Sequence, residues 1–153
     1  MLAIRVADFS DPVAQQLAAA CRAELIERYG GEDAPLPTPE EFSGDSGRFL
    51  VGWLGDRAVA GGGVRRLDAV TAEIKRMYVA PDVRGHGHSR VLLAALEAVA
   101  ADLGYQQVWL ETGTRQPEAI ALYESSGYSP LTPYGWYRDA PDVRCYAKNL
   151  TVP

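Results

Sequence analysis

The pattern of apolar and polar residues divides the chain into short strands and amphipathic helices. Residues 2–8 alternate apolar and polar side chains, which predicts a half-buried strand. Residues 13–29 carry apolar side chains at helical spacing, with Pro12 at the first helical position and Gly30 at the end. By the same criteria we expect strands at 48–54, 58–67, 72–79, 106–112 and within 128–149, and helices at 89–103 and 118–126. The order β-α-β-β-β-α-β-α-β-β predicts one mixed α/β sheet covered by helices.

Glycines mark details of this expected sheet. Gly55 and Asp56 separate the strands at 48–54 and 58–67, which predicts a tight hairpin. The triplet Gly61–Gly63 either weakens its strand or marks a bulge or a close backbone approach. Residues 32–47 are rich in proline, acidic residues and glycine, and a long loop of this kind in a compact domain is usually functional or mobile.

Composition and charge narrow the class of protein. The 153 residues suit one domain spanning 1–153, and 47% hydrophobic with 23% charged residues is the balance of a globular protein. The net charge of −5 argues against nucleic acid or an anionic membrane as a partner. Cys21 and Cys145 are too few for a disulfide framework, so we expect reduced thiols. The chain has no run of 18 apolar residues and no signal-peptide core at its N-terminus, which predicts a soluble cytoplasmic protein.

The stretch RGHGHS, residues 84–89, lies between an expected strand and an expected helix. The first N–H groups of a helix lack intrahelical partners, and the helix dipole adds partial positive charge there. Gly85 and Gly87 let the backbone approach a ligand closely, and Arg84 adds a fixed charge with bidentate donors. Together these features predict a cradle for a pyrophosphate group.

Other functions of this loop are weaker predictions. A Walker A loop is excluded because the chain has no GxxxxGK[ST] run, and a Rossmann fingerprint would need glycine where Arg90 stands. A metal site on His86 and His88 would lack further ligands, because no other histidine exists and no carboxylate or cysteine run lies nearby. The remaining alternative is a glycine-rich turn that simply starts a helix.

Several motifs in order from residue 73 to residue 128 resemble the GCN5-related N-acetyltransferases, the GNAT family. Arg84, Gly87 and Ser89 occupy the positions of that family's loop between a strand and a long helix, with Ser89 where glycine or alanine is usual. Gln116 stands where asparagine is common, at a position whose side chain typically reaches the pantetheine arm. The later motif positions are Gln116, Ala119, Tyr123, Gly127 and Tyr128.

The resemblance implies a fold and a cosubstrate. It implies a single N-acetyltransferase domain whose mixed, mostly antiparallel central sheet is flanked by helices and splayed between the strands 72–79 and 106–112. It implies acetyl-CoA as cosubstrate and no metal, with the pyrophosphate on the N–H groups of residues 84–90 and the pantetheine added to the sheet like a strand. The cofactor-binding residues expected on this basis are Met77, Tyr78, Val79, Arg84, Gly85, His86, Gly87, His88, Ser89, Arg90, Gln116 and Tyr123.

The resemblance also implies catalytic roles, with the acetyl group passing directly to the amine. Tyr123 matches the tyrosine that the family commonly uses as general acid, and a phenol is protonated at neutral pH yet able to donate to a thiolate. The N–H group of Val79 is the expected oxyanion donor. Glu73 is the expected general base, the alternative being an exposed carboxylate at a strand start, and Glu111 is the second candidate base.

The acceptor is expected to be the primary amine of a small molecule. By analogy it lies between the loop 30–47 and the C-terminal hairpin, where the aromatic residues Tyr134–Tyr137 form a wall. The acidic residues of the loop either attract a cationic amine or form a solvated surface: Glu32, Asp33, Glu40 and Glu41. The alternative functions are a protein or peptide N-acetyltransferase and a non-catalytic acyl-CoA-binding module, and a homodimer is a possible partner state.

Overall fold

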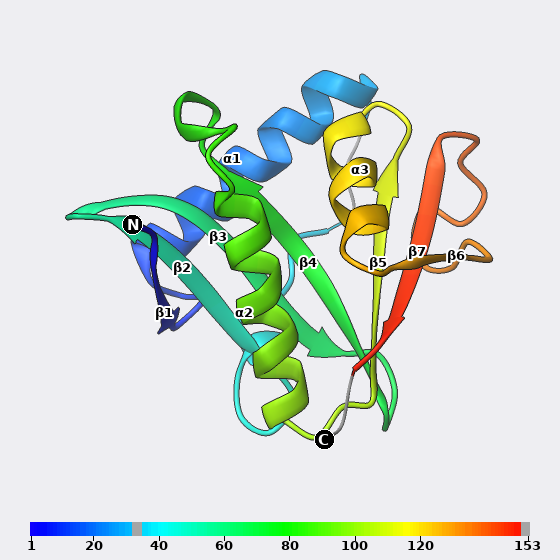
Figure 1. Ribbon diagram of the computed structural model, residues 1–153, viewed down its shortest axis with the longest axis horizontal. Helices are drawn as coiled ribbons and strands as arrows, with labels where there is room; N and C mark the ends of the chain where they lie inside the picture. The colour runs from blue at the N-terminus through cyan, green and yellow to red at the C-terminus, as the bar shows by residue number, and fades with distance from the viewer. Residues whose placement is uncertain (32–34, 151–153) are drawn as a thin grey trace.

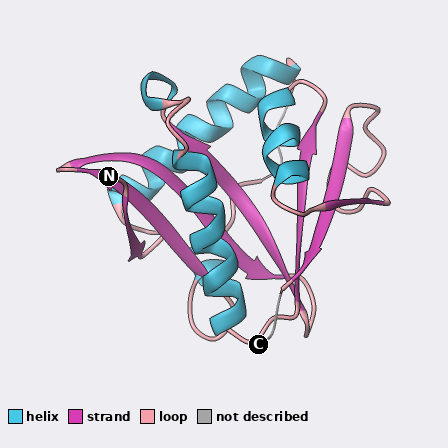
Figure 2. Ribbon diagram, viewed as in Figure 1, coloured by secondary structure: helices cyan, strands magenta, loops and turns pink. Residues whose placement is uncertain are grey.

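The computed structural model describes residues 1–31 and 35–150. These residues form a seven-stranded sheet in the order β1-β2-β3-β4-β5-β7-β6, with helices on both faces (Figures 1 and 2). The pairing of β4 with β5 is parallel and the other pairings are antiparallel, so the predicted mixed, mostly antiparallel α/β sheet is confirmed. The elements are β1 (Ala3–Ala7), α1 (Pro12–Tyr29), η1 (Pro39–Phe42), β2 (Arg48–Leu54), β3 (Arg57–Arg66), β4 (Thr71–Val79), η2 (Pro81–Val83), α2 (His88–Asp102), β5 (Gln107–Gly113), α3 (Pro117–Ser125), β6 (Ser129–Leu131) and β7 (Val143–Asn149).

The two faces of the sheet are covered by different helices. On one face, α1 and η1 pack over the rings of Phe9, Phe42 and Phe49, whose centroids lie 4.9 to 5.5 Å apart. On the other face, α2 and α3 cover the larger apolar cluster (Figure 1). The buried side chains of α2 follow the helical repeat that its sequence predicts: Leu92, Leu93, Leu96 and Ala100.

The glycine triplet of β3 serves close packing at a bulge. A Cβ atom at Gly63 would overlap the ring of Phe42, and one at Gly62 would lie 3.1 Å from Leu96 on the opposite face. The register between β3 and β4 shifts at this point, and Arg76 of β4 takes the positive φ of 58°. The bulge and the close backbone approach are both present, and the bulge redirects the last residues of β4.

The strands β4 and β5 separate part of the way along their length. They pair from Thr71 with Gln107 to Ile74 with Leu110, and no further pairing between them follows in the described residues. In Figure 1 the two strands run together at the bottom and diverge toward the top, beside α3. The predicted splay is therefore confirmed, and it opens the sheet at the end of β4 that carries the glycine-rich loop. Across residues 1–31 and 35–150, no helix has both the length and the apolar character needed to cross a membrane.

Candidate active site

The loop between β4 and α2 presents backbone donors to open space. Gly85 and Gly87 have φ values of 84° and 82°, which glycine adopts without strain, and a Cβ atom at either would meet nothing within 4 Å. The first helical hydrogen bond of α2 runs from the N–H of Val91 to the C=O of Gly87. The N–H groups of residues 88–90 therefore have no partner inside the helix, and an anion fits the open side of the loop.

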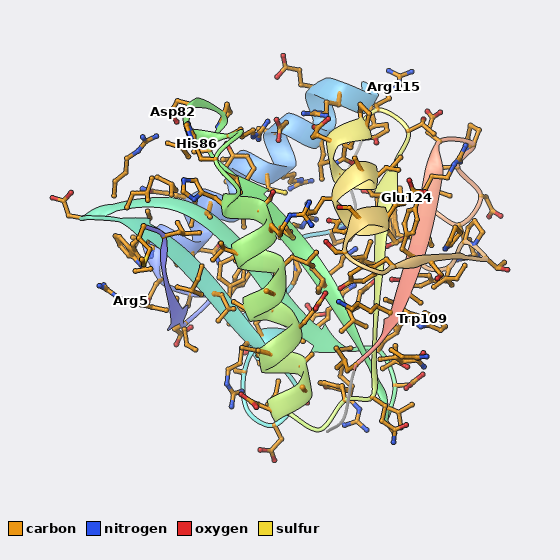
Figure 3. The ribbon with its side chains drawn as sticks, viewed as in Figure 1. Arg5, Asp82, His86, Trp109, Arg115 and Glu124 are labelled. Atoms are coloured by element: carbon orange, nitrogen blue, oxygen red, sulfur yellow. The ribbon has the colours of Figure 1, made fainter. Side chains whose placement is uncertain are left out.

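The two histidines of this loop do not assemble a metal site. Their ring centroids lie 6.0 Å apart, and His86 is exposed at the loop, as Figure 3 shows. Within the part of the chain that the structure describes, no three histidine, cysteine, aspartate or glutamate side chains are grouped to hold a metal ion.

A cavity of about 190 Å³ leads from this loop along the end of β4 to α3. Most of the residues that the resemblance predicts to bind the cofactor line this cavity, whereas His86, Gly87 and Arg90 do not. The guanidinium of Arg90 instead donates to the hydroxyls of Ser125 and Ser126 at the end of α3. The predicted residues that line the cavity are Met77, Tyr78, Val79, Arg84, Gly85, His88, Ser89, Gln116 and Tyr123.

A second cavity, of about 320 Å³, occupies the splay between β4 and β5. Residues from α1, β4, β5, β7 and the segment that precedes β7 line it. Of the segments predicted to flank the acceptor, the loop 30–47 contributes Gly31 to the lining and the aromatic wall contributes Tyr137. Met77, Gln116 and Tyr123 line both cavities. The two spaces therefore meet at these three side chains.

Arg84 connects the loop to α1. Its Nη1 and Nη2 atoms donate to the carboxylate of Glu24 at 2.7 and 2.9 Å, and its Nε donates to the C=O of Val79 at 2.8 Å. The hydrogen bonds from Arg84 to Glu24 lower the pKa of the Glu24 carboxyl below its ordinary value. The sequence predicted that the donors of Arg84 face a phosphate, whereas in this structure they face Glu24 and Val79.

The backbone of Val79 faces the splay rather than β3. The N–H of Ala80 bonds to the C=O of Val59, and Ala60 stands opposite Val79 in the antiparallel register. Bonded and non-bonded pairs alternate in such a ladder, so the polar groups of Val79 point away from β3. The bond from Arg84 to the Val79 carbonyl agrees with this orientation. The Val79 N–H is thus available on the side of the first cavity.

Tyr123 stands at the junction of the two cavities. The residue is only 7% exposed, and its ring contacts those of Tyr128 and Tyr146 at centroid distances of 5.7 and 6.3 Å. Its hydroxyl lies 4.0 Å from the Sδ atom of Met77. Burial raises the pKa of this phenol above its ordinary value, so the hydroxyl keeps its proton.

Glu73, the base expected from the resemblance, lines neither cavity. The residue is 2% exposed, so the alternative of an exposed carboxylate is wrong. Its Oε1 accepts from Arg65, which also bonds to Glu41 of η1, and its Oε2 accepts from the hydroxyl of Tyr134 at 2.7 Å. The carboxylate thus joins η1, β3, β4 and the segment before β7.

Replacing Tyr134 by phenylalanine tests this structural role of Glu73. The change removes a hydrogen bond to a buried carboxylate, so we expect the free energy of unfolding to fall by about 2 kcal/mol. The melting temperature should drop by roughly 4–8 °C, measured by thermal denaturation. Trp136→Phe is the control because Trp136 lies in the same segment with 62% of its surface exposed. Equal melting temperatures for the two variants would contradict the role.

Glu111 is the carboxylate that lines the second cavity. Its side chain is 6% exposed, and its Oε1 lies 3.2 Å from the Nζ of Lys75. Its Oε2 is buried, and a hydrogen bond from the backbone N–H of Tyr137 to the carboxylate lowers the pKa of Glu111. Burial outweighs this contribution and that of Lys75, and it raises the pKa of Glu111. Sequence reasoning ranked Glu111 second because spacing alone does not show which carboxylate faces the splay.

The end of α1 is attached to the start of α3 across the top of both cavities. The Tyr29 hydroxyl donates to the Oε1 of Gln116 at 3.1 Å. Arg28 and Arg115 each donate to the other's backbone carbonyl, at 2.8 and 3.0 Å, and Arg115 is labelled at this junction in Figure 3. Sequence reasoning did not find Tyr29 or Arg28, because no local pattern links α1 to a segment 87 residues away. Glu32 and Asp33, predicted as part of the acidic loop, lie outside the described residues.

Comparisons with known proteins agree with this arrangement. A family model described as the acetyltransferase (GNAT) family matches residues 15–128, which include most of α1, the loop after β4, and α3. An IAA acetyltransferase of Azospirillum brasilense is 36% identical over 124 residues, which are 77% of this chain and 81% of that protein.

Two solved structures are similar along nearly their whole length. One is a putative acyl-CoA N-acyltransferase from Klebsiella pneumoniae, with a TM-score of 0.82, 30% identity and 99% of each chain covered. The other is a GNAT family acetyltransferase from Elizabethkingia anophelis with acetyl-CoA bound, which has a TM-score of 0.73 and 18% identity, with 97% of this chain and 98% of that chain covered.

Proposed function

Because the chain belongs to the GNAT acetyltransferase family and is therefore an acyltransferase, we propose that it transfers the acetyl group of acetyl-CoA to the primary amine of a small molecule. The observation that carries the proposal is the meeting of the two cavities at Met77, Gln116 and Tyr123. One cavity starts at an anion-binding loop, as a long phosphorylated thioester requires, and the other has the size of a small-molecule site. We propose that one domain, residues 1–153, carries both sites.

The loop fits the pyrophosphate of coenzyme A. Open space lies beside Gly85 and Gly87, where a Cβ atom would stand, and the free donors of residues 88–90 border it. The pantetheine would extend along Tyr78 and Val79. The N–H of Val79 points away from β3 and lies beyond the part of β4 that pairs with β5, so it is a donor for the pantetheine. The relative from Elizabethkingia anophelis, which has acetyl-CoA bound, supports this placement by its fold.

The residues at the junction are proposed to move the protons of the reaction. Acetyl-CoA, when bound, supplies the acetyl thioester, whose carbon–sulfur bond breaks as the carbon–nitrogen bond of the amide forms. Glu111 takes one proton from the ammonium group of the acceptor, and the N–H of Val79 donates to the acyl oxygen. Tyr123 gives its proton to the leaving sulfur. The second amine proton restores the phenol, and the proton on Glu111 passes to solvent.

In this proposal Glu73 positions the walls of the acceptor cavity and Glu111 is the base. The bonds that Arg65 and Tyr134 make to Glu73 occupy both of its oxygens. Glu111, by contrast, lines the acceptor cavity. The cytoplasmic location and the homodimer remain predictions from the sequence.

Thiol release from acetyl-CoA with a panel of amines tests the function. Turnover with small amines supports it, whereas turnover with peptides alone would favour the protein acetyltransferase. A melting temperature raised by acetyl-CoA without thiol release from any amine or peptide would favour the non-catalytic acyl-CoA-binding module.

Gly87→Val tests the phosphate cradle. A valine side chain at a φ of 82° is strained and fills the open side of the loop, so we expect the affinity for acetyl-CoA to fall at least about tenfold. Isothermal titration calorimetry measures this affinity. Gly55→Val is the matched control, because Gly55 has a φ of 62° and open space around it but lies in the β2–β3 turn. The control should lose stability and keep its affinity, and an equal loss of affinity in both variants would refute the cradle.

A further inference from the structure

The side chain of Arg84, at the start of the glycine-rich loop, is held by the protein itself. Its Nη1 and Nη2 atoms donate to the two carboxylate oxygens of Glu24 at 2.7 and 2.9 Å, which is the bidentate geometry of a strong charge-assisted pair. Its Nε donates to the carbonyl of Val79 at 2.8 Å, and its guanidinium carbon lies 5.5 Å from the centre of the Tyr78 ring. Each of the three guanidinium nitrogens therefore has an acceptor.

Glu24, on α1, belongs to a chain of opposite charges along the wall of the first cavity. Its Oε1 also lies 3.4 Å from the Nη2 of Arg28, one helical turn later. Arg28 in turn lies 2.6 Å from the carboxylate of Glu118, in the first turn of α3. All four side chains line the first cavity: Arg84, Glu24, Arg28 and Glu118. The chain of charges joins the glycine-rich loop to α1 and α3.

The pair with Glu24 fixes the direction of the third donor of Arg84. A guanidinium is planar, so a carboxylate that binds Nη1 and Nη2 also sets the direction of Nε. In this structure Nε points to the Val79 carbonyl, and the N–H of the same residue is the proposed donor to the acyl oxygen. Arg84 also directly precedes Gly85, so its fixed side chain restrains the backbone where it enters the loop. Glu24 thus restrains both the end of β4 and the start of the loop.

The phosphate site of the loop is built from backbone rather than from the charge of Arg84. The carboxylate of Glu24 compensates that charge. The cradle consists of the N–H groups at the start of α2 and the open space beside Gly85 and Gly87. Glycines at positive φ have wide conformational freedom, so such a cradle depends on contacts that hold its backbone. A residue that holds it before the ligand arrives lowers the entropic cost of binding.

We propose that Glu24 is a positioning residue for acetyl-CoA, which holds Arg84 so that the glycine-rich loop and Val79 keep the conformation that binds the cosubstrate. In this role Glu24 acts through Arg84 and not on the phosphate or on the reacting atoms. The inference rests on the proposed use of acetyl-CoA, but it is tested by binding alone and does not depend on the identity of the amine.

Glu24→Gln removes the charge of Glu24 and one of its two acceptor oxygens. We expect the affinity for acetyl-CoA, measured by isothermal titration calorimetry, to fall at least about tenfold. The KM for acetyl-CoA should rise in proportion while kcat stays within a few-fold, because saturating cosubstrate restores the bound conformation. The pair is partly exposed, so we expect only a small loss of stability.

Asp82→Asn is the matched control. Asp82 binds Arg57 with the same bidentate geometry, at 2.7 and 2.8 Å, two residues before Arg84, and it lines neither cavity. The control changes the net charge of the protein equally and should keep the affinity for acetyl-CoA. An equal loss of affinity in both variants would overturn the role of Glu24.

Arg84→Met and the double variant complete a thermodynamic cycle. Positioning through Arg84 predicts that each single variant loses affinity and that the double variant binds no more weakly than the weaker of the two. If Arg84 were instead a phosphate ligand for which Glu24 competes, Glu24→Gln would bind acetyl-CoA more tightly. Tighter binding, unchanged binding or additive losses would overturn this proposal alone, whereas a wild-type protein that does not bind acetyl-CoA would overturn the proposed function as well.

Discussion

Replacing Tyr123 by phenylalanine is expected to lower kcat at least about 100-fold, because the leaving sulfur loses its proton donor. The affinity for acetyl-CoA should stay within a few-fold of the wild-type value, since the ring that lines both cavities is retained. The two measurements are thiol release under saturating substrates and calorimetric titration with acetyl-CoA. A loss confined to kcat identifies a group that acts on the reaction rather than on cosubstrate binding.

The fold should survive this change. Among the residues that the structure describes, the hydroxyl of Tyr123 makes only the weak contact with Met77 at 4.0 Å, so its removal leaves none of their strong donors or acceptors unpaired. Tyr128→Phe is the matched control from the same aromatic cluster, because its hydroxyl bonds to Glu97 and lines neither cavity. The control should lose stability and keep kcat. A wild-type kcat in Tyr123→Phe at every pH would show that another group protonates the sulfur.

The elements of the fold could be predicted from local patterns. The turn at Gly55 and Asp56, the proline at the start of α1 and the glycine after α3 each have a local conformational cause, and the structure has an element boundary at each. The splay between β4 and β5 was expected from the resemblance alone. Its physical cause is tertiary, since the bulge at Arg76 depends on the packing of Gly62 and Gly63 against side chains from both faces.

The candidate site could be predicted from the residues only where it depends on a backbone conformation. The loop of residues 84–90 was found because glycines at a helix start have few other uses. The side chains were harder, since their partners come from distant segments. Arg84 is held by Glu24, which lies 60 residues away, and Glu73 is held by Tyr134, which lies 61 residues away. No spacing rule in one sequence links such pairs.

The two buried glutamates illustrate this limit. Glu73 and Glu111 lie on neighbouring strands, and each has a cationic partner, Arg65 or Lys75. What separates them is their surroundings, since Tyr134 binds the second oxygen of Glu73, which lines neither cavity, whereas Glu111 lines the second cavity. Gly135 packs closely against Glu111, because a Cβ atom there would lie 3.2 Å from the Oε2 of Glu111. The segment before β7 therefore packs against both carboxylates, and of the two Glu111 is the one that lines a cavity.

Glu111→Gln should accordingly lower kcat/KM for a primary amine by about 100-fold or more, the usual contribution of a general base. The pH profile provides the sharper test. Only the ionised carboxylate accepts a proton, so wild-type kcat/KM falls as the pH is lowered through the pKa of Glu111, which burial raises above the ordinary glutamate value. This fall at low pH is the acidic limb of the profile, and the glutamine variant should lack it. The alkaline limb, which ionisation of the amine itself causes near pH 10, stays in both proteins.

Two further variants show which carboxylate produces the acidic limb of the pH profile. Glu111→Asp keeps an ionisable group and should keep the limb at a reduced rate, because the shorter side chain places the carboxylate farther from the acceptor. Glu73→Gln weakens the contacts with Arg65 and Tyr134, so it should lower the melting temperature but retain the limb. If Glu73→Gln removed the acidic limb and Glu111→Gln preserved it, Glu73 would be the base.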